Sequence, residues 1–397
     1  MNVLPQLSSS PPQFFTVSLA ITPSNMLKTS SQNGGSDARL EALKKWLTVE
    51  ADPMGTHGLA VDDIVSASSD ASFRRYFRVP CVGSSGHKSL IVMDAPPPQE
   101  DCKPFVSVAH SFAQAGAAVP TIFAQDLERG FLLLSDFGNQ TFWASVNEQS
   151  AAVANPFYSA ALNDLVALQA KFNQNGAEPA EPSLPPYSRE VLLRELMLYP
   201  QWYVAKHKKI TLSAAQNKIL LDAFELIIAN NLAQAKVAVH RDYHSRNLMV
   251  LANPQTSLGL ASSAKIGMID FQDALWGPAS YDVVSLLRDA YIEWEEHDVL
   301  DWAIRYWEKA RTAGIPLQAE FGDFYRDFEW MGLQRHLKVL GIFARLAHRD
   351  GKERYLADIP LVLKYALGEA SRYRALGPLA QLMQTIEGAT EQSGYTF

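Results

Sequence analysis

The sequence predicts an α+β protein with a small lobe of strands and a larger, mainly helical lobe. Two short apolar runs, at 89–93 and 131–135, predict buried strands in the first part of the chain. From residue 138 onward, long segments with apolar residues at helical spacing take their place. One strand-like pair, 247–251 and 265–270, interrupts them and is joined by a stretch rich in Gly, Ser, Asn and Pro. We therefore expect a hairpin embedded in the helical lobe.

Composition divides the chain of 397 residues into an extension and two lobes. Residues 1–36 are rich in Ser, Pro, Asn, Gln and Thr, which predicts a disordered extension. Its apolar stretch 14–22 resembles a signal peptide, but no Lys or Arg precedes it. We expect the small lobe at 37–137 and the helical lobe at 138–397.

The small lobe is expected to hold two helices and three strands. Residues 38–48 have apolar side chains along one side of a helix, and 103–116 predict a second helix. Residues 72–79 alternate as a strand does. Together with the two buried runs, they predict a small sheet.

The larger lobe is expected to be built from helices. Residues 150–172 predict a helix broken near Pro156, followed by a Pro-rich loop at 173–187. The further predicted helices are at 188–205, 213–232, 279–292, 295–313 and 322–347.

The charge and the cysteine content exclude several classes of protein. A net charge of -7 and an isoelectric point near 5.7 are wrong for a protein that coats nucleic acid or an anionic membrane. Two cysteines, Cys81 and Cys102, provide no disulfide framework, which favours the cytoplasm. No apolar run reaches the roughly 18 residues of a membrane span. We expect a small-molecule substrate, with no nucleic acid, no membrane and no obligatory protein partner.

The stretch 240–247 carries the most informative side chains. Phosphoryl transfer needs a carboxylate that orients the attacking hydroxyl and accepts its proton, and oxygen ligands for Mg²⁺. Asp242 fits the first role. Asn247 begins one strand of the predicted hairpin and Asp270 ends the other, so antiparallel pairing would bring these two magnesium ligands together. The alternative, that a loop Asp and Asn only cap turns, leaves the hairpin and the second Asp unexplained.

The spacing H-x-D-x-x-x-x-N matches the catalytic loop of kinases. The runs that carry a broader resemblance are HRDYHSRNLMV (240–250), IDFQDALWGPASYDVVSLLRDAY (269–291), SSDASFRRYFRV (68–79), LLLSDFGNQTFW (132–143) and MGLQRHLKVLGIFARLAHRDGKERYLADIP (331–360). With them the chain resembles the aminoglycoside phosphotransferase and choline kinase superfamily. More narrowly, it is similar to the bacterial N-acetylmuramate/N-acetylglucosamine anomeric kinases of peptidoglycan recycling. The likeness covers about residues 38–375.

This resemblance implies a two-lobed, protein-kinase-like fold and the transfer of phosphate from ATP, with Mg²⁺, to the C1 hydroxyl of an amino sugar. It implies that Asp242 is the catalytic base and that Asn247 and Asp270 bind the metal. His240 and Asp282 are expected to order the catalytic loop.

The triplet Asp136-Phe137-Gly138 has the letters of the metal-binding triplet of protein kinases but lies far before the catalytic loop. The resemblance places it at the hinge between the lobes, where the backbone of Ser135, Asp136 and Phe137 would bind adenine.

One departure concerns the lysine that kinase-like folds carry on the third strand to hold phosphates. Met93 stands at that position, and the helix predicted at 103–116 has no acidic residue to pair with a lysine. Replacement cations are expected among Arg74, Arg75 and Arg78, and Ser72 lies in the turn that is usually rich in glycine.

Four residues are candidates for binding the sugar: Arg246 in the catalytic loop, Gln272, Glu195, and Lys338 on a basic face of the last long helix, near Arg335 and His336. The preferred sugar stays open between N-acetylmuramate and N-acetylglucosamine. The alternatives are a kinase of another hydroxyl compound (an aminoglycoside, choline or homoserine) and a nucleotide-binding pseudokinase scaffold.

Overall fold

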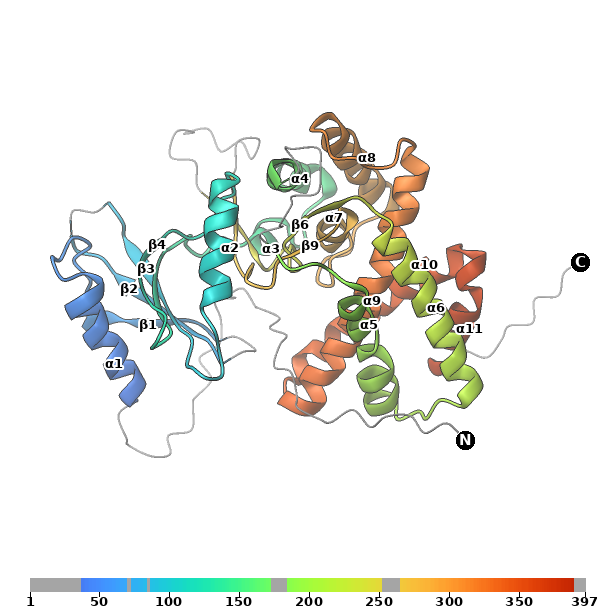
Figure 1. The fold of residues 1–397 in the computed structure, drawn as a ribbon, viewed down its shortest axis with the longest axis horizontal. Helices are drawn as coiled ribbons and strands as arrows, with labels where there is room; N and C mark the ends of the chain where they lie inside the picture. Colours follow the sequence, from blue (N-terminus) through green and yellow to red (C-terminus); the bar gives the residue numbers. More distant parts are fainter. Residues whose placement is uncertain (1–36, 70–72, 84–85, 173–183, 252–264, 389–397) are drawn as a thin grey trace, which may run out of the picture. The chain divides into compact units, whose positions relative to one another are not determined.

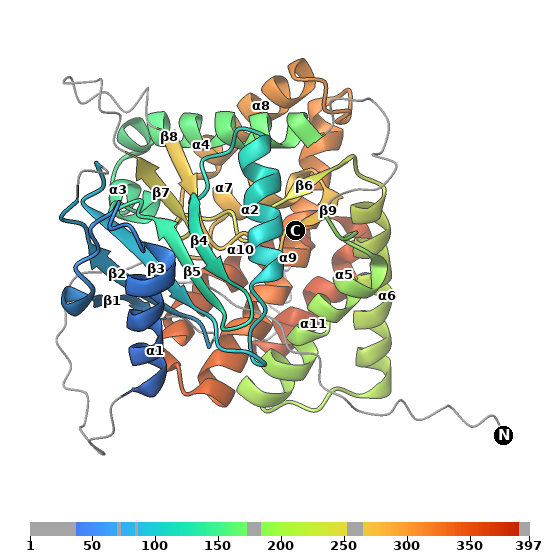
Figure 2. The ribbon, with the colours of Figure 1, turned by 60° about the vertical axis from the view of Figure 1, so that its left-hand side comes forward.

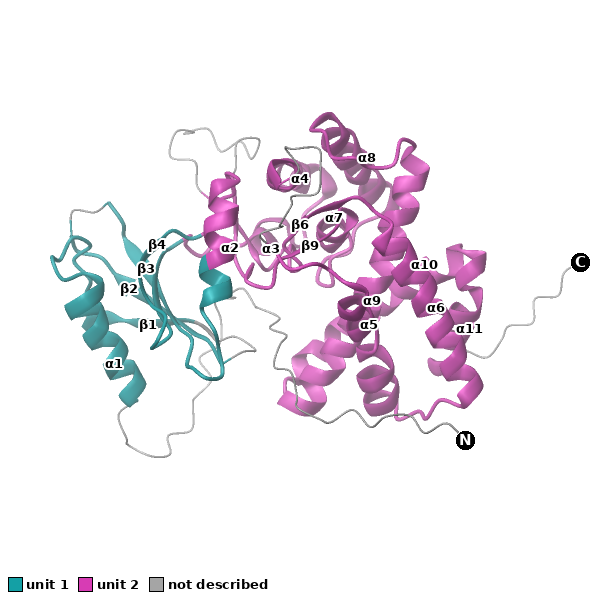
Figure 3. Cartoon of the chain, viewed as in Figure 1, with its two compact units in different colours: residues 1–106, 120–136 teal, residues 107–119, 137–397 magenta. Residues whose placement is uncertain are grey.

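The computed structural model describes residues 37–69, 73–83, 86–172, 184–251 and 265–388 (Figure 1). The chain forms two compact units, which are described separately (Figure 3). The first holds residues up to 106 together with 120–136, and the second holds 107–119 together with the rest of the chain from 137. The predicted extension 1–36 lies outside the described residues.

The first unit is built on a five-stranded antiparallel sheet in the order β1-β2-β3-β5-β4. Its strands are β1 (Val65–Ser69), β2 (Arg75–Pro80), β3 (Ser89–Asp94), β4 (Ile122–Asp126) and β5 (Phe131–Ser135). The helix α1 (Ala38–Trp46) begins at the side-chain cap of Asp37 and continues as a π-helical turn, Leu47–Ala51. Alternate apolar residues of β2, β3 and β5 pack against α1 to form the core of this unit.

The predicted strands in this unit are present, and two further strands were missed. β1 reads VSASS, which has no apolar alternation for sequence reasoning to detect. β4 is partly exposed and carries one large aromatic side chain, Phe123. The helix predicted at 103–116 is α2 (Lys103–Gln114), whose first residue donates its N–H to Asp101 at 2.9 Å. From Ser107 onward this helix belongs to the second unit.

The second unit is mainly helical, as predicted, and α9 runs through its interior with nearly every residue from Phe324 to Ala347 buried. Its helices are α3 (Phe142–Val146), α4 (Ala151–Phe172), α5 (Arg189–Leu196), a π-helix (Tyr199–His207), α6 (Ala214–Leu232), α7 (Ser280–Leu287), α8 (Glu296–Thr312), α9 (Phe321–Asp350), α10 (Ile359–Arg372) and α11 (Gly377–Ile386). Short 3-10 turns at Glu353–Asp358 and Arg374–Leu376 flank α10.

Two predictions about these helices were wrong. α4 is not broken at Pro156, its sixth residue. The proline lacks an N–H donor and its ring crowds the carbonyl four residues earlier, but the long buried face beyond it keeps the helix continuous. The single helix expected at 188–205 is α5 followed by the π-helix, with Pro200 in the first turn of the π-helix.

Two short antiparallel ladders position the candidate site. β6 (Lys236–Val239) pairs with β9 (Leu275–Pro278), and β7 (Leu248–Leu251) pairs with β8 (Lys265–Met268). The β7–β8 pair is the predicted hairpin, and it lies against α4 (Figure 2). The loop 240–247 therefore connects β6 to β7, and the segment 269–274 connects β8 to β9. No helix among the described residues is long and apolar enough to cross a membrane.

Candidate active site

The start of the loop 240–247 is held by a buried carboxylate from α7. Asp282 is fully buried, and its two oxygens accept the backbone N–H groups of His240 at 2.7 Å and Arg241 at 3.0 Å. Burial raises the pKa of Asp282 to about 7, although these two N–H donors act in the opposite direction. The ring of His240 is also buried, and its Nδ1 accepts the N–H of Asp242 at 3.3 Å. Burial lowers the pKa of His240 to about 3, so this ring is a neutral acceptor.

The far side of the same loop is held by a second carboxylate, Asp289, which sequence reasoning missed. Asp289 follows the end of α7 and accepts the N–H of Ser245 at 2.9 Å and that of Tyr291 at 3.2 Å. It is 1% exposed. The available signal was its position seven residues after Asp282 within the helix predicted at 279–292, although α7 ends at Leu287 and Asp289 lies beyond it.

Arg241 connects the loop to two helices through Glu195. Arg241 has a left-handed backbone with φ 76°, and its guanidinium pairs with Glu195 of α5. Glu195 also pairs with Lys338 of α9, with Nζ and Oε1 3.3 Å apart, and accepts the hydroxyl of Tyr187. Burial alone would raise the pKa of Glu195, but the charges of Lys338 and Arg241 hold it below its usual value.

Two predicted sugar-binding residues therefore use their charged groups for contacts within the protein. Glu195 is fully buried, and Lys338 is 4% exposed and also donates to the hydroxyl of Tyr281 at 2.9 Å. The arrangement joins α5, α9 and the loop.

The two predicted metal ligands meet, as the hairpin pairing required. Asn247 Nδ2 lies 3.3 Å from Asp270 Oδ2 and donates to the backbone carbonyl of Asp242 at 3.2 Å. Gln272 Nε2 donates to the other oxygen of Asp270 at 2.9 Å. Asp270 has a left-handed backbone with φ 65°. Asn247 Oδ1 is buried and has no hydrogen-bond partner among the described residues, so this oxygen is available to a cation.

Asp242 is partly exposed, and its side chain accepts no hydrogen bond from the described residues. Burial raises the pKa of Asp242, while the nearby charges of Lys338 and Arg241 lower it and that of Asp273 raises it. An aspartate in this state can accept a proton from a bound hydroxyl more readily than an exposed one.

Arg246 projects from the same loop among aromatic side chains. Its guanidinium lies over the ring of Tyr291, 3.6 Å from the centroid, and 5.8 Å from that of Trp143. These cation–π contacts fix the direction of a partly exposed side chain next to the candidate metal ligand Asn247.

The predicted phosphate-binding arginines lie in the first unit and are paired with carboxylates there. Arg75 binds Asp94 at 2.6 Å as well as Asp37, and Arg74 Nε lies 3.1 Å from Glu100. Each arginine would have to share or exchange its partner to hold a phosphate. Ser72 lies outside the described residues.

Met93, which stands where kinase-like folds carry lysine, is fully buried in β3. The next residue, Asp94, is also fully buried and binds Arg39 at 2.6 Å as well as Arg75. The end of this strand therefore carries a structural ion cluster.

The three predicted adenine-binding residues lie at the end of β5 and just after it. Ser135 exchanges hydrogen bonds with Thr121, both at 2.9 Å. The carboxylate of Asp136 is bound by Arg78 and by the hydroxyl of Ser89 at 2.6 Å. Any contact of Asp136 with adenine would therefore use its backbone, as predicted. Phe137 belongs to the second unit, where its ring fills the space that a side chain on Gly267 would need.

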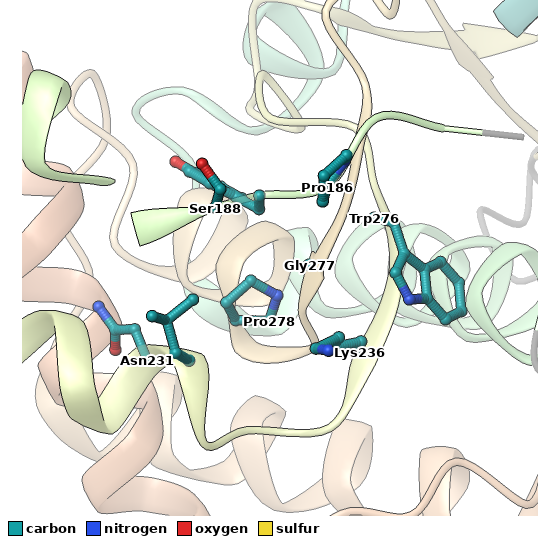
Figure 4. Close-up of a pocket in the computed structure, with 9 residues that line it drawn as sticks. Pro186, Ser188, Asn231, Lys236, Trp276, Gly277 and Pro278 are labelled. Carbon is teal, nitrogen blue, oxygen red and sulfur yellow. The ribbon is translucent and has the colours of Figure 1, made fainter. Parts of the chain in front are cut away.

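A pocket of about 150 Å³ lies elsewhere in the second unit (Figure 4). It is lined by Pro186, Tyr187, Ser188, Asn231, Leu232, Lys236, Trp276, Gly277 and Pro278. None of the predicted site residues lines it, although the hydroxyl of its Tyr187 binds Glu195.

Comparison with known proteins gives a consistent result. Residues 63–315 match the model of the phosphotransferase enzyme family. The chain is 44% identical to the N-acetylmuramate/N-acetylglucosamine kinase of Pseudomonas aeruginosa, with 89% of this chain and 99% of that protein covered. It is also 44% identical to the kinase of the same name from Neisseria meningitidis serogroup B, with 84% and 94% covered.

Solved structures show the same fold at low sequence identity. The choline kinase LicA from Streptococcus pneumoniae matches with a TM-score of 0.54 and 9% identity, over 82% of this chain and 99% of that one. An ethanolamine kinase from Plasmodium vivax matches with a TM-score of 0.53 and 11% identity, over 85% and 96%. These structures support the predicted two-lobed, kinase-like architecture.

Proposed function

Because the chain belongs to the phosphotransferase enzyme family, we propose that it transfers the γ-phosphoryl group of ATP to the anomeric C1 hydroxyl of N-acetylmuramate, N-acetylglucosamine or both. The sugar is proposed from the names of relatives that are 44% identical over nearly their whole length. The observation that carries the catalytic part is the hydrogen-bonded group in which Asn247 joins Asp242 to Asp270. We further propose that the enzyme works in the cytoplasm, in peptidoglycan recycling.

In the proposed reaction, the carboxylate of Asp242 accepts the proton of the C1 hydroxyl. The C1 oxygen forms a bond to the γ-phosphorus as the bond between that phosphorus and the bridging oxygen to the β-phosphate breaks, and ADP leaves. Asp282 and Asp289 keep the Asp242 loop in one position by holding its backbone N–H groups. Such positioning is a large part of phosphoryl-transfer catalysis, since the protein contributes little covalent chemistry.

The residues present fit a magnesium ion. Asn247 Oδ1 is a buried amide oxygen with no hydrogen-bond partner among the described residues, and Asp270 provides a carboxylate beside it. Magnesium prefers a few such oxygen ligands and completes its shell with phosphate oxygens and water. When bound, the metal would neutralise charge on the phosphates.

We assign Glu195 and Lys338 to positioning of Arg241 and the loop, because their mutual contacts occupy them. Arg246 and Gln272 stay proposed as sugar-binding residues, and Ser135, Asp136 and Phe137 as the adenine-binding segment.

The direct test is incubation of the protein with Mg·ATP and single acceptors: the two amino sugars, choline, homoserine and an aminoglycoside. Phosphorus NMR of the products should show an anomeric phosphate with at least one amino sugar. Transfer only to choline, homoserine or the aminoglycoside would replace the proposed substrate. Tight ATP binding with no transfer to any acceptor would identify a pseudokinase scaffold.

A further inference from the structure

A buried guanidinium on the helix behind the candidate site makes no hydrogen bond or ion pair with the described residues. Arg335 lies on α9 and is 4% exposed, and its Nη1 has no hydrogen-bond partner among the described residues. It also forms no ion pair with any of these residues. Burying a charged donor without an acceptor costs several kcal/mol on the order-of-magnitude scale for buried ions. Such a group is therefore a candidate for binding a ligand of opposite charge.

The two residues next to Arg335 on α9 each form side-chain hydrogen bonds. Gln334 Nε2 donates to the carbonyl of Leu192 at 3.0 Å. His336 contacts Glu369 at 2.8 Å and the carbonyl of Arg288 at 3.1 Å. These contacts fix the helix on both sides of Arg335, so its side chain starts from a rigid backbone.

Arg335 is on the part of α9 that lies near the catalytic loop. Lys338, one turn further along, pairs with Glu195, which binds Arg241 of the loop. The charge of Arg335 also reaches the loop and its supports, since it lowers the pKa of Asp242, Asp282, Asp289 and His244. The guanidinium of Arg335 therefore belongs to the same group of charges as the proposed base.

The nearby carboxylates are not available to it. Asp282 and Asp289 use their oxygens for backbone N–H groups of the loop and of Tyr291. Asp242 has to keep its carboxylate open to the attacking hydroxyl. The remaining partner is an anion on a bound ligand, and the test below separates an anion on the acceptor from the transferred phosphoryl group.

The two proposed sugars differ in one group. N-acetylmuramate carries a lactyl ether on O3 that ends in a carboxylate, and N-acetylglucosamine has a hydroxyl there. We propose that Arg335 binds the lactyl carboxylate and thereby determines how well the enzyme uses N-acetylmuramate relative to N-acetylglucosamine. Arginine suits this role because its planar fork binds a carboxylate through two parallel hydrogen bonds. This inference rests on the proposed function and names a specificity residue for it.

The test compares kcat/KM for both sugars in Arg335→Gln, Arg335→Lys and wild type, on the pH plateau of activity. Arg335→Gln should lower kcat/KM for N-acetylmuramate by about 100-fold, equivalent to about 2.7 kcal/mol. For N-acetylglucosamine, kcat/KM of the same variant should fall by less than about 3-fold, because no charged contact to this sugar is removed. Arg335→Lys keeps the charge without the fork, so it should recover part of the loss.

Arg345 provides a matched control on the same helix. It is 8% exposed, and its Nε is buried without a hydrogen-bond partner among the described residues. It lies ten residues beyond Arg335, roughly 15 Å along the helix axis. Arg345→Gln should leave the ratio of kcat/KM for the two sugars unchanged.

The outcomes separate this inference from the function on which it rests. If Arg335→Gln lowers activity on both sugars equally, the guanidinium serves the loop or the transferred phosphoryl group, and the inference is wrong. An unchanged rate with N-acetylmuramate would also overturn it. A wild-type enzyme that phosphorylates neither sugar would refute the proposed function instead. Turnover of N-acetylglucosamine in the same preparation shows that each variant is folded.

Discussion

Three of the aspartates around the loop 240–247 differ in what their oxygens contact. Asp282 and Asp289 are almost completely buried, and their oxygens accept backbone N–H groups. Asp242 is partly exposed, and its side chain accepts no hydrogen bond from the described residues. The proposed base therefore differs from the two carboxylates that hold the loop, because its side-chain oxygens accept no hydrogen bond from the described residues.

Replacing Asp242 by Asn removes the proton acceptor and keeps the size of the side chain. We expect kcat to fall by about 10³-fold or more, as for loss of a positioned general base. Binding of Mg·ATP should persist, because Asn247 and Asp270 are unchanged. Single-turnover kinetics and calorimetric titration measure the two quantities. More than about a tenth of the wild-type rate would show that Asp242 is not the base.

The pH dependence of activity follows from the charges near Asp242. Burial raises the pKa of Asp242, Lys338 lowers it, and Asp273 raises it. Since the base must be deprotonated, Lys338→Gln should raise this pKa and move the acid limb of kcat/KM to higher pH. Asp273→Asn should move the limb to lower pH. If the acid limb moves in the same direction in both variants, the group that titrates in this limb is not Asp242.

The stability of the site depends on Glu195. It pairs with two buried cations, Arg241 and Lys338, which are 5% and 4% exposed. Glu195→Gln removes the carboxylate that both share, and we expect the free energy of unfolding to fall by about 3–5 kcal/mol. Glu225→Gln, which breaks an exposed pair with Arg189, should cost less than about 1 kcal/mol. Urea unfolding compares the two, and equal losses would argue against a buried cluster that supports the loop.

At the scale of elements, α7 supports both ends of the loop. Asp282 lies in its first turn and Asp289 just beyond its last. The loop between them also joins two short ladders, so its position is determined by a helix and two strand pairs. A change at one anchor should loosen one part of the loop and leave the fold intact.

Asp289→Asn tests the anchor that sequence reasoning missed. An amide in its place can satisfy only one of the N–H groups of Ser245 and Tyr291, so the part of the loop near Asn247 should become less ordered. Loss of such a positioning contact typically costs 10–100-fold in activity or metal affinity. We expect a fall of about that size in kcat, with KM for the sugar nearly unchanged. If kcat falls and KM rises by the same factor, or if only stability falls, Asp289 has a purely structural role.

Apolar spacing and turn residues predicted most of the helices and several of the strands. The buried strands at 89–93 and 131–135, the hairpin and most of the long helices were found where spacing and turn residues placed them. The β6–β9 ladder was missed, because its two short strands are far apart in the sequence and no turn-rich stretch connects them directly, as one does in the β7–β8 hairpin. The π-helix Tyr199–His207 could not be predicted from apolar spacing, because that spacing assumes the 3.6 residues per turn of an α-helix.

For the whole molecule, the sequence predicted which candidate residues lie together where one loop and one hairpin connect them. Asp242, Asn247 and Asp270 are joined by one loop and one hairpin, so their spacing carried the information. The ion pair between Glu195 and Arg241 spans 46 residues, and Arg335 comes from a later helix. Only tertiary packing brings these residues to the loop, and no sequence motif records it.

Ligand binding should stabilise the whole chain through the same residues. A ligand that binds only the folded state at 100 times its Kd adds about 2.7 kcal/mol to stability. With a non-hydrolysable ATP analogue and Mg²⁺, wild type and Asp242→Asn should therefore show clear increases in Tm, and EDTA should remove the part that depends on the metal. Asp270→Asn should lose that part, because Asn247 alone would hold the ion. An equal Mg²⁺-dependent increase in Asp270→Asn would place the metal elsewhere, and the arrangement of Asn247 beside Asp270 would need another explanation.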